Sequence, residues 1–556
     1  TTWDNNGQDD VFLFDMSSGQ LVLPNTSKDG KPGNGGSSLS LFSANAHRLI
    51  FTSNSSNLTS ENLIDSSPDN PSQIYVKDLL TGQMTLVATT PDGLPGNGRS
   101  EKPVLSNDGR WLVFQSTADN LKISGAGTGN EIYLKNLDSG QIGWVASASD
   151  LTGELSDVVG SPVFSPNSEW LAFTSYAPNL VANDDNTQSD VFIKRLSDNE
   201  IVLVSQNAQG KSGSGPSNQP LFSPDNKWLA FESAASDLIV GEHSNDWNNL
   251  FLRNLETGST QLANNYVGTI PGAGWSNSAT FSTSGQWLLF AANAPNPLTG
   301  EMGNERKLFF KNLNDGQTRL VNTSEDGSEG NGTMTHWPVF SPHDEWLAFW
   351  SNASNLVEND ANKRLDLFLK NPLTGQNVLI NAASDGSLGN DNLIMDPESS
   401  IELVRQGYLF ISDQGTLNER DQWLIFISKA SNLVVNDDNG ANPDVFVRNL
   451  QTGEVQLLFT AADGTQANKD NDNYDFACAP DARSVVFASS AYNIVPGDKN
   501  GVADVFIKDL FTGSVQRLVV GQGETFEDFE FSPTGEYISY IGGGHLYVTP
   551  NPYWLG

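Results

Sequence analysis

The chain has 556 residues, of which 66 are acidic and 30 are basic, so its formal net charge is −36 at pH 7. Binding to nucleic acid or to an anionic membrane surface needs clustered positive charge, so this balance disfavours both kinds of partner. An aromatic content of 10% argues against a disordered chain. No apolar run approaches the length of about 18 residues that marks a membrane-spanning helix, and we expect no transmembrane segment.

One hydrophobic block recurs along the whole chain. It reads FSPNSEWLAF over Phe164–Phe173, FSPDNKWLAF over Phe222–Phe231 and FSPHDEWLAF over Phe340–Phe349. The aromatic residue that closes the block recurs about every sixty residues, at Phe51, Phe114, Phe173, Phe231, Phe290, Phe349, Phe426, Phe487 and Tyr540. The spacing is widest after Phe349, which predicts an insertion over about residues 396–420.

A second block follows each first one. It reads DVFIKRL from Asp190, DLFLKNP from Asp366, DVFVRNL from Asp444 and DVFIKDL from Asp504. A short turn comes next, and its central position is held by Gly82, Gly140, Gly258, Gly316, Gly375, Gly453 and Gly513, with Asn199 in the remaining copy. Because glycine and asparagine accept a positive φ, each copy predicts a hairpin with a left-handed turn residue. The SPDG-type centre of the first block predicts another hairpin.

Each repeat therefore contains four short strands and no helical periodicity. Four strands per unit, repeated many times, predict an all-β protein that forms a single β-propeller across residues 1–556. We expect nine four-stranded blades, with eight or ten as alternatives. The segment from Asp10 is a second block without a first, and the segment that ends at Tyr540 is a first block without a complete second. N- and C-terminal strands would then close the ring in one blade, with residues 541–556 as an extra strand or tail.

The recurrent FSPDNKWLAF block and its sister sequences resemble the TolB-type, WD40-like (PD40) propeller repeat. The resemblance covers nearly the whole chain and implies the propeller fold. It implies little about function, because this repeat serves many roles.

The loop before the third strand of a repeat carries a pattern of alternating Asp and Asn. The pattern comprises Asp4, Asn6 and Asp10; Asp184, Asn186 and Asp190; Asp360, Asn362 and Asp366; Asp437, Asn439 and Asp444; and Asp498, Asn500 and Asp504. Carboxylate and amide oxygens at alternate positions resemble calcium loops of the EF-hand and integrin-propeller type, and predict calcium sites. The alternative is that these side chains bond to nearby backbone N–H groups and shape the loop without metal.

A second loop pattern is rich in glycine and crosses from one blade to the next, as in SKDGKPGNGG from Ser27 and TPDGLPGNGR from Thr90. It matches neither known phosphate-binding motif and precedes a strand rather than a helix. We therefore interpret these glycines as serving the backbone conformation of the crossover.

Catalytic patterns are weak in this sequence. The five histidines are scattered along the chain, and neither a HExxH nor a GxSxG motif is present. We therefore predict a protein that is not an enzyme. The alternative is a carbohydrate-active enzyme, either a lyase or a glycosidase, with a pair of carboxylates at the mouth of the propeller channel.

The tryptophans divide into two groups. One group shares a single repeat position and is expected in the core between blades: Trp111, Trp170, Trp228, Trp287, Trp346 and Trp423. A second group lies in loops and, with the neighbouring His336, is predicted to form a face for a ligand or partner: Trp247, Trp275 and Trp337. The single cysteine, Cys478, stands where sister repeats carry Phe, so we expect a buried apolar residue.

Together these features predict an exported, non-catalytic binding or scaffold protein. Its loop face would engage a protein or a glycan, with calcium stabilising the loops, and nucleic acid is not expected as a partner. The chain begins at Thr1 inside a motif that recurs later. We interpret this start as that of a processed chain in the periplasm, outside the cell or on the cell surface.

Overall fold

The structure is a computed structural model that describes residues 7–15, 20–27, 29–59, 72–121, 131–147, 162–177, 180–239, 248–263, 276–295, 302–334, 338–341, 343–358, 360, 362, 364–390, 423–435, 437, 444–469, 476–481 and 483–554. The predicted insertion over residues 396–420 lies outside these residues. The chain divides into two compact units, Thr1–Arg319 and Leu320–Gly556.

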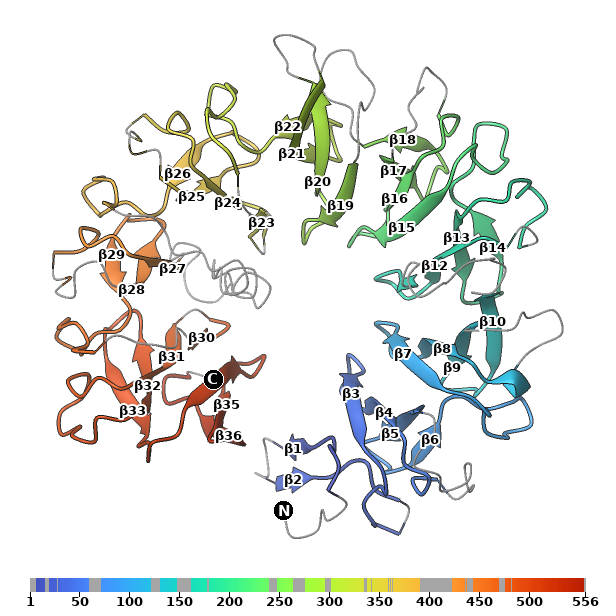
Figure 1. The fold of residues 1–556 in the computed structure, drawn as a ribbon, viewed down its shortest axis with the longest axis horizontal. Helices are drawn as coiled ribbons and strands as arrows, with labels where there is room; N and C mark the ends of the chain where they lie inside the picture. The colour runs from blue at the N-terminus through green and yellow to red at the C-terminus, as the bar shows by residue number, and fades with distance from the viewer. Residues whose placement is uncertain are drawn as a thin grey trace. The chain divides into compact units, whose positions relative to one another are not determined.

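The first unit begins with a two-stranded sheet of β1 (Leu13–Asp15) and β2 (Gln20–Val22). Five four-stranded sheets follow among the described residues, the last of which ends at the boundary of the unit (Figure 1). The first of these sheets contains β3 (Ser37–Phe42), β4 (Arg48–Ser53), β5 (Gln73–Asp78) and β6 (Met84–Leu86), and the second contains β7 (Ser100–Leu105), β8 (Trp111–Ser116), β9 (Glu131–Asn136) and β10 (Ile142–Ser147). The third contains β11 (Val163–Phe164), β12 (Trp170–Ser175), β13 (Asp190–Arg195) and β14 (Ile201–Leu203), and the fourth contains β15 (Ser217–Phe222), β16 (Trp228–Ser233), β17 (Asn249–Asn254) and β18 (Thr260–Leu262). The fifth comprises β19 (Ser276–Phe281), β20 (Trp287–Pro295), β21 (Met302–Asn312) and β22 (Thr318–Leu320).

The second unit contains four further sheets in its described part (Figure 1). They are β23 (Val339–Phe340), β24 (Leu347–Ser351), β25 (Asp366–Lys370) and β26 (Asn377–Leu379); β27 (Trp423–Ser428), β28 (Asp444–Asn449) and β29 (Val455–Leu457); β30 (Phe476–Cys478), β31 (Ser484–Ser489), β32 (Asp504–Asp509) and β33 (Val515–Val519); and β34 (Phe526–Phe531), β35 (Tyr537–Gly542) and β36 (His545–Pro550). The segment His545–Pro550, where an extra strand or a tail was expected, pairs with β35 in antiparallel register.

Within each sheet the strands lie in chain order and pair antiparallel, which is the architecture of a propeller blade. Most of these sheets have four strands, and the described helical structure is one 3₁₀ turn, Asp119–Leu121. The predicted all-β propeller fold is therefore confirmed. The number of blades and the joining of the two termini concern both units together, and they stay predictions.

The predicted hairpin turns have the expected backbone conformation. Every turn position named from the sequence has a positive φ between 66° and 83°, namely Gly82, Gly140, Asn199, Gly258, Gly316, Gly375, Gly453 and Gly513. A polar residue just before the turn holds it closed, as where Asn371 Oδ1 accepts hydrogen bonds from the N–H groups of Leu373 and Thr374. The local sequence alone therefore dictates these turns.

The glycine-rich crossovers are closed loops with a defined shape. In one of them Thr89 and Pro95 form a β-bridge, and Gly93 adopts a φ of 83°. The Asn120 amide donates to the Pro95 carbonyl at 2.6 Å, and the Asn97 N–H donates to Asn120 Oδ1 at 2.9 Å. Equivalent bonds recur in other blades, so the glycines serve the backbone conformation, as the sequence indicates.

Stacked aromatic pairs on the two central strands of a blade form the core. The closing aromatic of the first block packs on an aromatic of the third strand, with ring centroids 5.5 to 5.8 Å apart, in the pairs Phe51–Tyr75, Phe114–Tyr133, Phe173–Phe192, Phe231–Phe251, Phe290–Phe309, Phe349–Phe368, Phe426–Phe446 and Phe487–Phe506. Both aromatic positions recur in the sequence repeat, so each of these blades contributes an equivalent stacked pair to the core.

The tryptophans at the shared repeat position do not all behave as predicted. Trp287 is 2% exposed and belongs to the core. In contrast, the side chains of Trp111, Trp170 and Trp346 pack against the core but are only half-buried, as is that of Trp228, so the prediction that they are core residues is confirmed only in part. They stand at or next to the start of the second strand, beside the SPDG-type turn, where one side of the indole meets solvent. The Trp423 side chain lies outside what the structure describes.

A basic residue of the third strand links neighbouring blades. Lys508 Nζ donates to the Leu458 carbonyl at 3.0 Å, and Lys135 Nζ donates to the Val87 carbonyl at 2.6 Å. Arg448 makes the same kind of bond, from Nη1 to the Ala382 carbonyl at 2.7 Å. These bonds satisfy carbonyls at the outer strand of the preceding blade. They explain the basic residue in the DVFIKRL-type block, to which the sequence pattern by itself assigns no role.

The environment of Cys478 matches the prediction from the sequence. The side chain is 5% exposed and packs in a cluster with Phe476 and Phe487, and burial raises the pKa of its thiol well above the usual value. Because the reactive species is the thiolate, the folded protein is expected to resist Ellman's reagent, whereas the denatured chain should release one equivalent of thiol. Rapid modification of the folded protein would contradict this packing.

Candidate functional site

The Asp and Asn residues of the predicted calcium loops build two consecutive turns. In the loop before β32, Asp498 Oδ1 accepts the N–H of Asn500 at 3.4 Å, and Asn500 Oδ1 accepts the N–H of Val502 at 3.3 Å. The Asn500 amide then donates to Asp504 Oδ1 at 2.9 Å. Bonds of this kind recur in the loops that begin at Asp184 and Asp360. The spacing of the motif thus places the carboxylates at its two ends near one another.

In the loop before β13, both carboxylates are buried. Asp190 is 0% exposed; its Oδ1 accepts from Ser205 Oγ at 2.6 Å and its Oδ2 accepts from Asn186 Nδ2 at 3.0 Å. Asp184 is 7% exposed, and its Oδ1 has no hydrogen-bond partner among the described residues. Burial raises the pKa of Asp190 to about 7; the bond from Ser205 opposes this shift, and the charge of Asp184 adds to it.

The loop before β25 has the same character. Asp360 is 4% exposed and Asp366 is 1% exposed. Asn381 Nδ2 donates to Asp366 Oδ1 at 2.5 Å, while Oδ2 of both aspartates has no hydrogen-bond partner in the described part of the chain. Burial raises the pKa of Asp366 to about 6; the bond from Asn381 and the nearby charge of Arg364 oppose this shift, and the charge of Asp360 adds to it.

In the loop before β32, a protein side chain supplies the positive charge. Arg517 Nη1 lies 3.3 Å from Asp498 Oδ1 and 2.9 Å from Asp504 Oδ2, and both aspartate side chains are at most 2% exposed. Burial alone would raise the pKa of Asp504. Bonds from Asn500, the Gly521 N–H and Arg517 reverse that effect, so the pKa is lowered.

The other predicted ligands are only partly described. Asp10 accepts a hydrogen bond from Asn25, and Asp444 Oδ1 accepts one from Gln466 at 3.1 Å. Asp437 is described, whereas Asp4, Asn6 and Asn439 lie outside the described residues. Within the described part of the chain, no cluster of three or more His, Cys, Asp or Glu side chains is arranged to hold a metal ion. Any cation in these loops would need further oxygen ligands from the backbone or from water.

The predicted partner face cannot be placed in this structure, because Trp247, Trp275, His336 and Trp337 all lie outside the described residues. The structure instead shows a cavity of about 540 Å³ between the sheets β7–β10 and β11–β14, beside the SPDG-type hairpins. The sequence instead predicts the partner face in the loops that carry Trp247, Trp275 and Trp337. The tryptophan that recurs at one position of each repeat is the sequence signal for this cavity, although its regular spacing by itself predicts a core residue.

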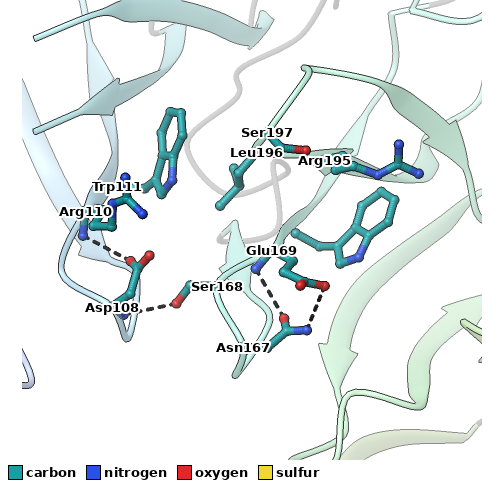
Figure 2. A pocket seen from close by; sticks show the side chains of 10 residues that line it. Asp108, Arg110, Trp111, Asn167, Ser168, Glu169, Arg195, Leu196 and Ser197 are labelled. Carbon is teal, nitrogen blue, oxygen red and sulfur yellow. Dashed lines mark hydrogen bonds between the residues drawn. The ribbon is translucent and has the colours of Figure 1, made fainter. Parts of the chain in front are cut away.

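Two tryptophans from neighbouring blades line this cavity. Trp111 begins β8 and Trp170 begins β12, and Arg195 lies over the Trp170 ring with its guanidinium carbon 4.8 Å from the ring centroid. Figure 2 shows Trp111 and Arg195 on opposite sides of the cavity, with Leu196 between them. The apolar walls are therefore two half-buried indoles that solvent reaches and the buried side chain of Leu196.

Charged and polar groups surround these indoles. Arg195 Nη1 is paired with Asp198 at 3.0 Å and with Glu200 at 2.7 Å. Glu169 accepts a hydrogen bond from Asn167 Nδ2 at 3.0 Å (Figure 2). Each of these charges already has a partner, and the rim offers both donors and acceptors to a ligand. Such a site suits a neutral, hydroxyl-rich ligand better than an anion.

In the described residues, no helix has the length and apolar character needed to cross a membrane. No protein-family model matches the chain, and no curated protein matches it.

Several solved structures with different names are similar to this chain at low sequence identity. TolB from Acinetobacter baumannii is 17% identical over 62% of this chain, with a TM-score of 0.27, and the match spans 64% of TolB, less than two thirds of its length. Dipeptidyl peptidase 4 from Porphyromonas gingivalis is 12% identical over 90% of this chain and 64% of that chain, with a TM-score of 0.41. The β-propeller domain of the Trilobed protease from Pyrococcus furiosus is 10% identical over 79% of this chain and 99% of that chain, with a TM-score of 0.30. The likeness is one of fold alone.

Proposed function

We propose that this propeller is an exported, non-catalytic binding scaffold, and that it binds a neutral glycan in the cavity between Trp111 and Trp170. The observation that carries the proposal is the pair of half-buried indoles from neighbouring blades, set in a cavity of about 540 Å³. A sugar ring presents C–H groups to an indole face and hydroxyl groups at its edge, which matches apolar walls with a polar rim.

The charges at the rim support a neutral rather than an acidic glycan. Arg110 Nε is paired with Asp138 at 3.1 Å, and the Arg195 guanidinium is shared by two carboxylates. An anionic sugar would be repelled by the carboxylates of Asp138, Asp198 and Glu200 beside these guanidinium groups, in a protein with a net charge of −36. Hydroxyl groups can bond to the same side chains without displacing them.

A carbohydrate-active enzyme is the alternative function. The carboxylate pairs Asp184 with Asp190, Asp360 with Asp366 and Asp498 with Asp504 are at most 7% exposed. The first and the last of these pairs are also held by side-chain and backbone hydrogen bonds. A pair that protonates a leaving group and activates water must reach the substrate. The burial of these carboxylate pairs favours a structural role over a catalytic one. We therefore propose that the protein releases its bound glycan unchanged.

A glycan array, followed by calorimetric titration of the best ligand, tests the proposal. Replacing Trp170 or Trp111 with Ala is expected to weaken binding by about tenfold or more, because the stacking surface is lost. Trp228→Ala is the matched control, since Trp228 occupies the same repeat position, is half-buried and does not line the cavity. Equal affinities of wild-type protein and the Trp170 and Trp111 variants would contradict the site. Cleavage of the bound glycan would contradict the non-catalytic function.

A further inference from the structure

Buried pairs of aspartates are costly unless a positive charge or a proton accompanies them. The chain contains three described loops of one design, at Asp184, Asp360 and Asp498, and a described cationic side chain bridges both carboxylates in the last. The first two loops leave buried carboxylate oxygens without a hydrogen-bond partner among the described residues. The charge of Arg364 opposes the rise in the pKa of Asp366 without cancelling it, so among the described residues no cation offsets the burial of either pair as Arg517 does in the third loop.

The fourth strand of each blade explains the difference between the loops. Arg517 on β33 stands opposite Phe506 of β32. The same register position is Leu203, opposite Phe192, in the blade with Asp190, and Leu379, opposite Phe368, in the blade with Asp366. A leucine cannot neutralise a carboxylate. The three blades therefore share the acidic pair and differ in whether the fourth strand supplies a cation.

We propose that the loops of Asp184 with Asp190 and of Asp360 with Asp366 each bind a calcium ion, and that Arg517 replaces the ion in the blade of Asp498 and Asp504. Carboxylate oxygens are hard ligands that suit calcium, and backbone carbonyls and water would complete the coordination shell. This inference is independent of the glycan site, which uses none of these residues.

The hydrogen bonds within the loop decide which side chains act as ligands. Asn186 donates its amide N–H groups to Asp190 Oδ2 and to the Gly213 carbonyl at 2.8 Å, and its Oδ1 accepts from the Gln188 N–H. The amide of Asn186 is therefore occupied in holding the loop, and we assign it a positioning role. The ligands supplied by side chains are the two carboxylates, of which Asp184 Oδ1 has no other described partner.

Counting bound calcium in the whole protein tests this assignment. The protein is treated with a chelator, desalted and titrated with calcium chloride by calorimetry, with equilibrium dialysis of radioactive calcium as an independent count. Asp184→Asn and Asp360→Asn are each expected to lower the number of bound ions by one. Arg517→Leu is expected to raise that number by one, since it exposes a third acidic pair of the same design. Arg517→Lys is the matched control, because it retains the positive charge and should leave the number unchanged.

Two results would overturn the proposal. One is an absence of calcium binding by the wild-type protein up to millimolar concentration, which would mean that protons or water satisfy the buried pairs. The other is an unchanged ion count in a folded Arg517→Leu variant, because the acidic loop would then not suffice for binding. Circular dichroism verifies that the variant is folded. Arg517→Gln is a second variant, which keeps a polar side chain without the charge, and it is also expected to bind one more calcium ion than the wild type. Loss of glycan binding in the Trp170 variant, with calcium binding retained, would separate the two proposals.

Discussion

Phe173→Ala is expected to lower the free energy of unfolding by about 3–5 kcal/mol, the largest loss of stability that we predict for a single substitution in this protein. The Phe173 ring is fully buried, lies 5.7 Å from Phe192 between centroids, and packs in a cluster with Val113 and Leu203. Truncation removes the buried apolar surface and leaves a cavity that the paired strands β12 and β13 cannot close. Denaturation by urea, followed by tryptophan fluorescence, measures the change.

Two controls accompany this variant. Phe173→Leu keeps most of the apolar volume and should cost clearly less than the alanine variant. Phe42→Ala removes the same side chain from a position that is 52% exposed in the same unit, and should change stability by at most about 0.5 kcal/mol. Similar losses from Phe42→Ala and Phe173→Ala would contradict the conclusion that the stacked pairs form the core.

The second large effect is a dependence of stability on pH above neutrality. Burial lowers the pKa of Lys508 to about 8, whereas a lysine in the unfolded chain titrates near 10.5. Below pH 8 the folded protein bears the full cost of holding this ammonium group in a buried site. Between the two pKa values the unfolded chain binds more protons than the folded one, so the free energy of unfolding rises with pH, by about 1–3 kcal/mol for this group. Unfolding curves at pH 7.5, 8.5 and 9.5 measure this slope.

Lys508→Arg separates this lysine from other groups that titrate in the same range. The variant reproduces the arrangement of Arg448, which donates to the carbonyls of Ile380 and Ala382 in the preceding blade. An arginine stays charged throughout this range, so the slope of stability against pH should become shallower than in the wild type. Lys135, which also has a pKa of about 8 because of burial, should behave in the same way in the first unit. A wild-type slope retained in both arginine variants would contradict the assignment.

The calcium and glycan proposals assign different roles to different parts of the blade. The acidic loops precede the third strand, as at Asp190 at the start of β13, whereas Trp170 begins β12 beside the SPDG-type hairpin. Antiparallel pairing sets Asp190 opposite Ser175, at the far end of β12 from Trp170. The two sites are therefore at opposite ends of the same pair of strands. Calcium would stiffen one end of the blade while the other end binds the ligand.

Sequence alone determined the blades, because the signals for strands and turns are local. The alternation of apolar residues predicts the strands, and the preference of Gly and Asn for positive φ predicts turns such as those at Gly82 and Asn199, which the structure confirms. The buried environment of Cys478 was also predictable, because sister repeats carry an aromatic residue there. Each of these features depends on a residue and its neighbours in the chain, or on its place in the period.

Only the tertiary structure decided which copies of a repeated motif differ in chemistry. The aspartate spacing is the same at Asp184 and Asp498, but whether a cation reaches the pair depends on the register of the fourth strand, which places Leu203 in one blade and Arg517 in the other. In the same way, the period placed Trp287 and Trp170 at equivalent positions, while packing buried the first and left the second beside a cavity. Burial and the approach of side chains from other strands are properties of long-range contacts, and a short sequence motif does not record them.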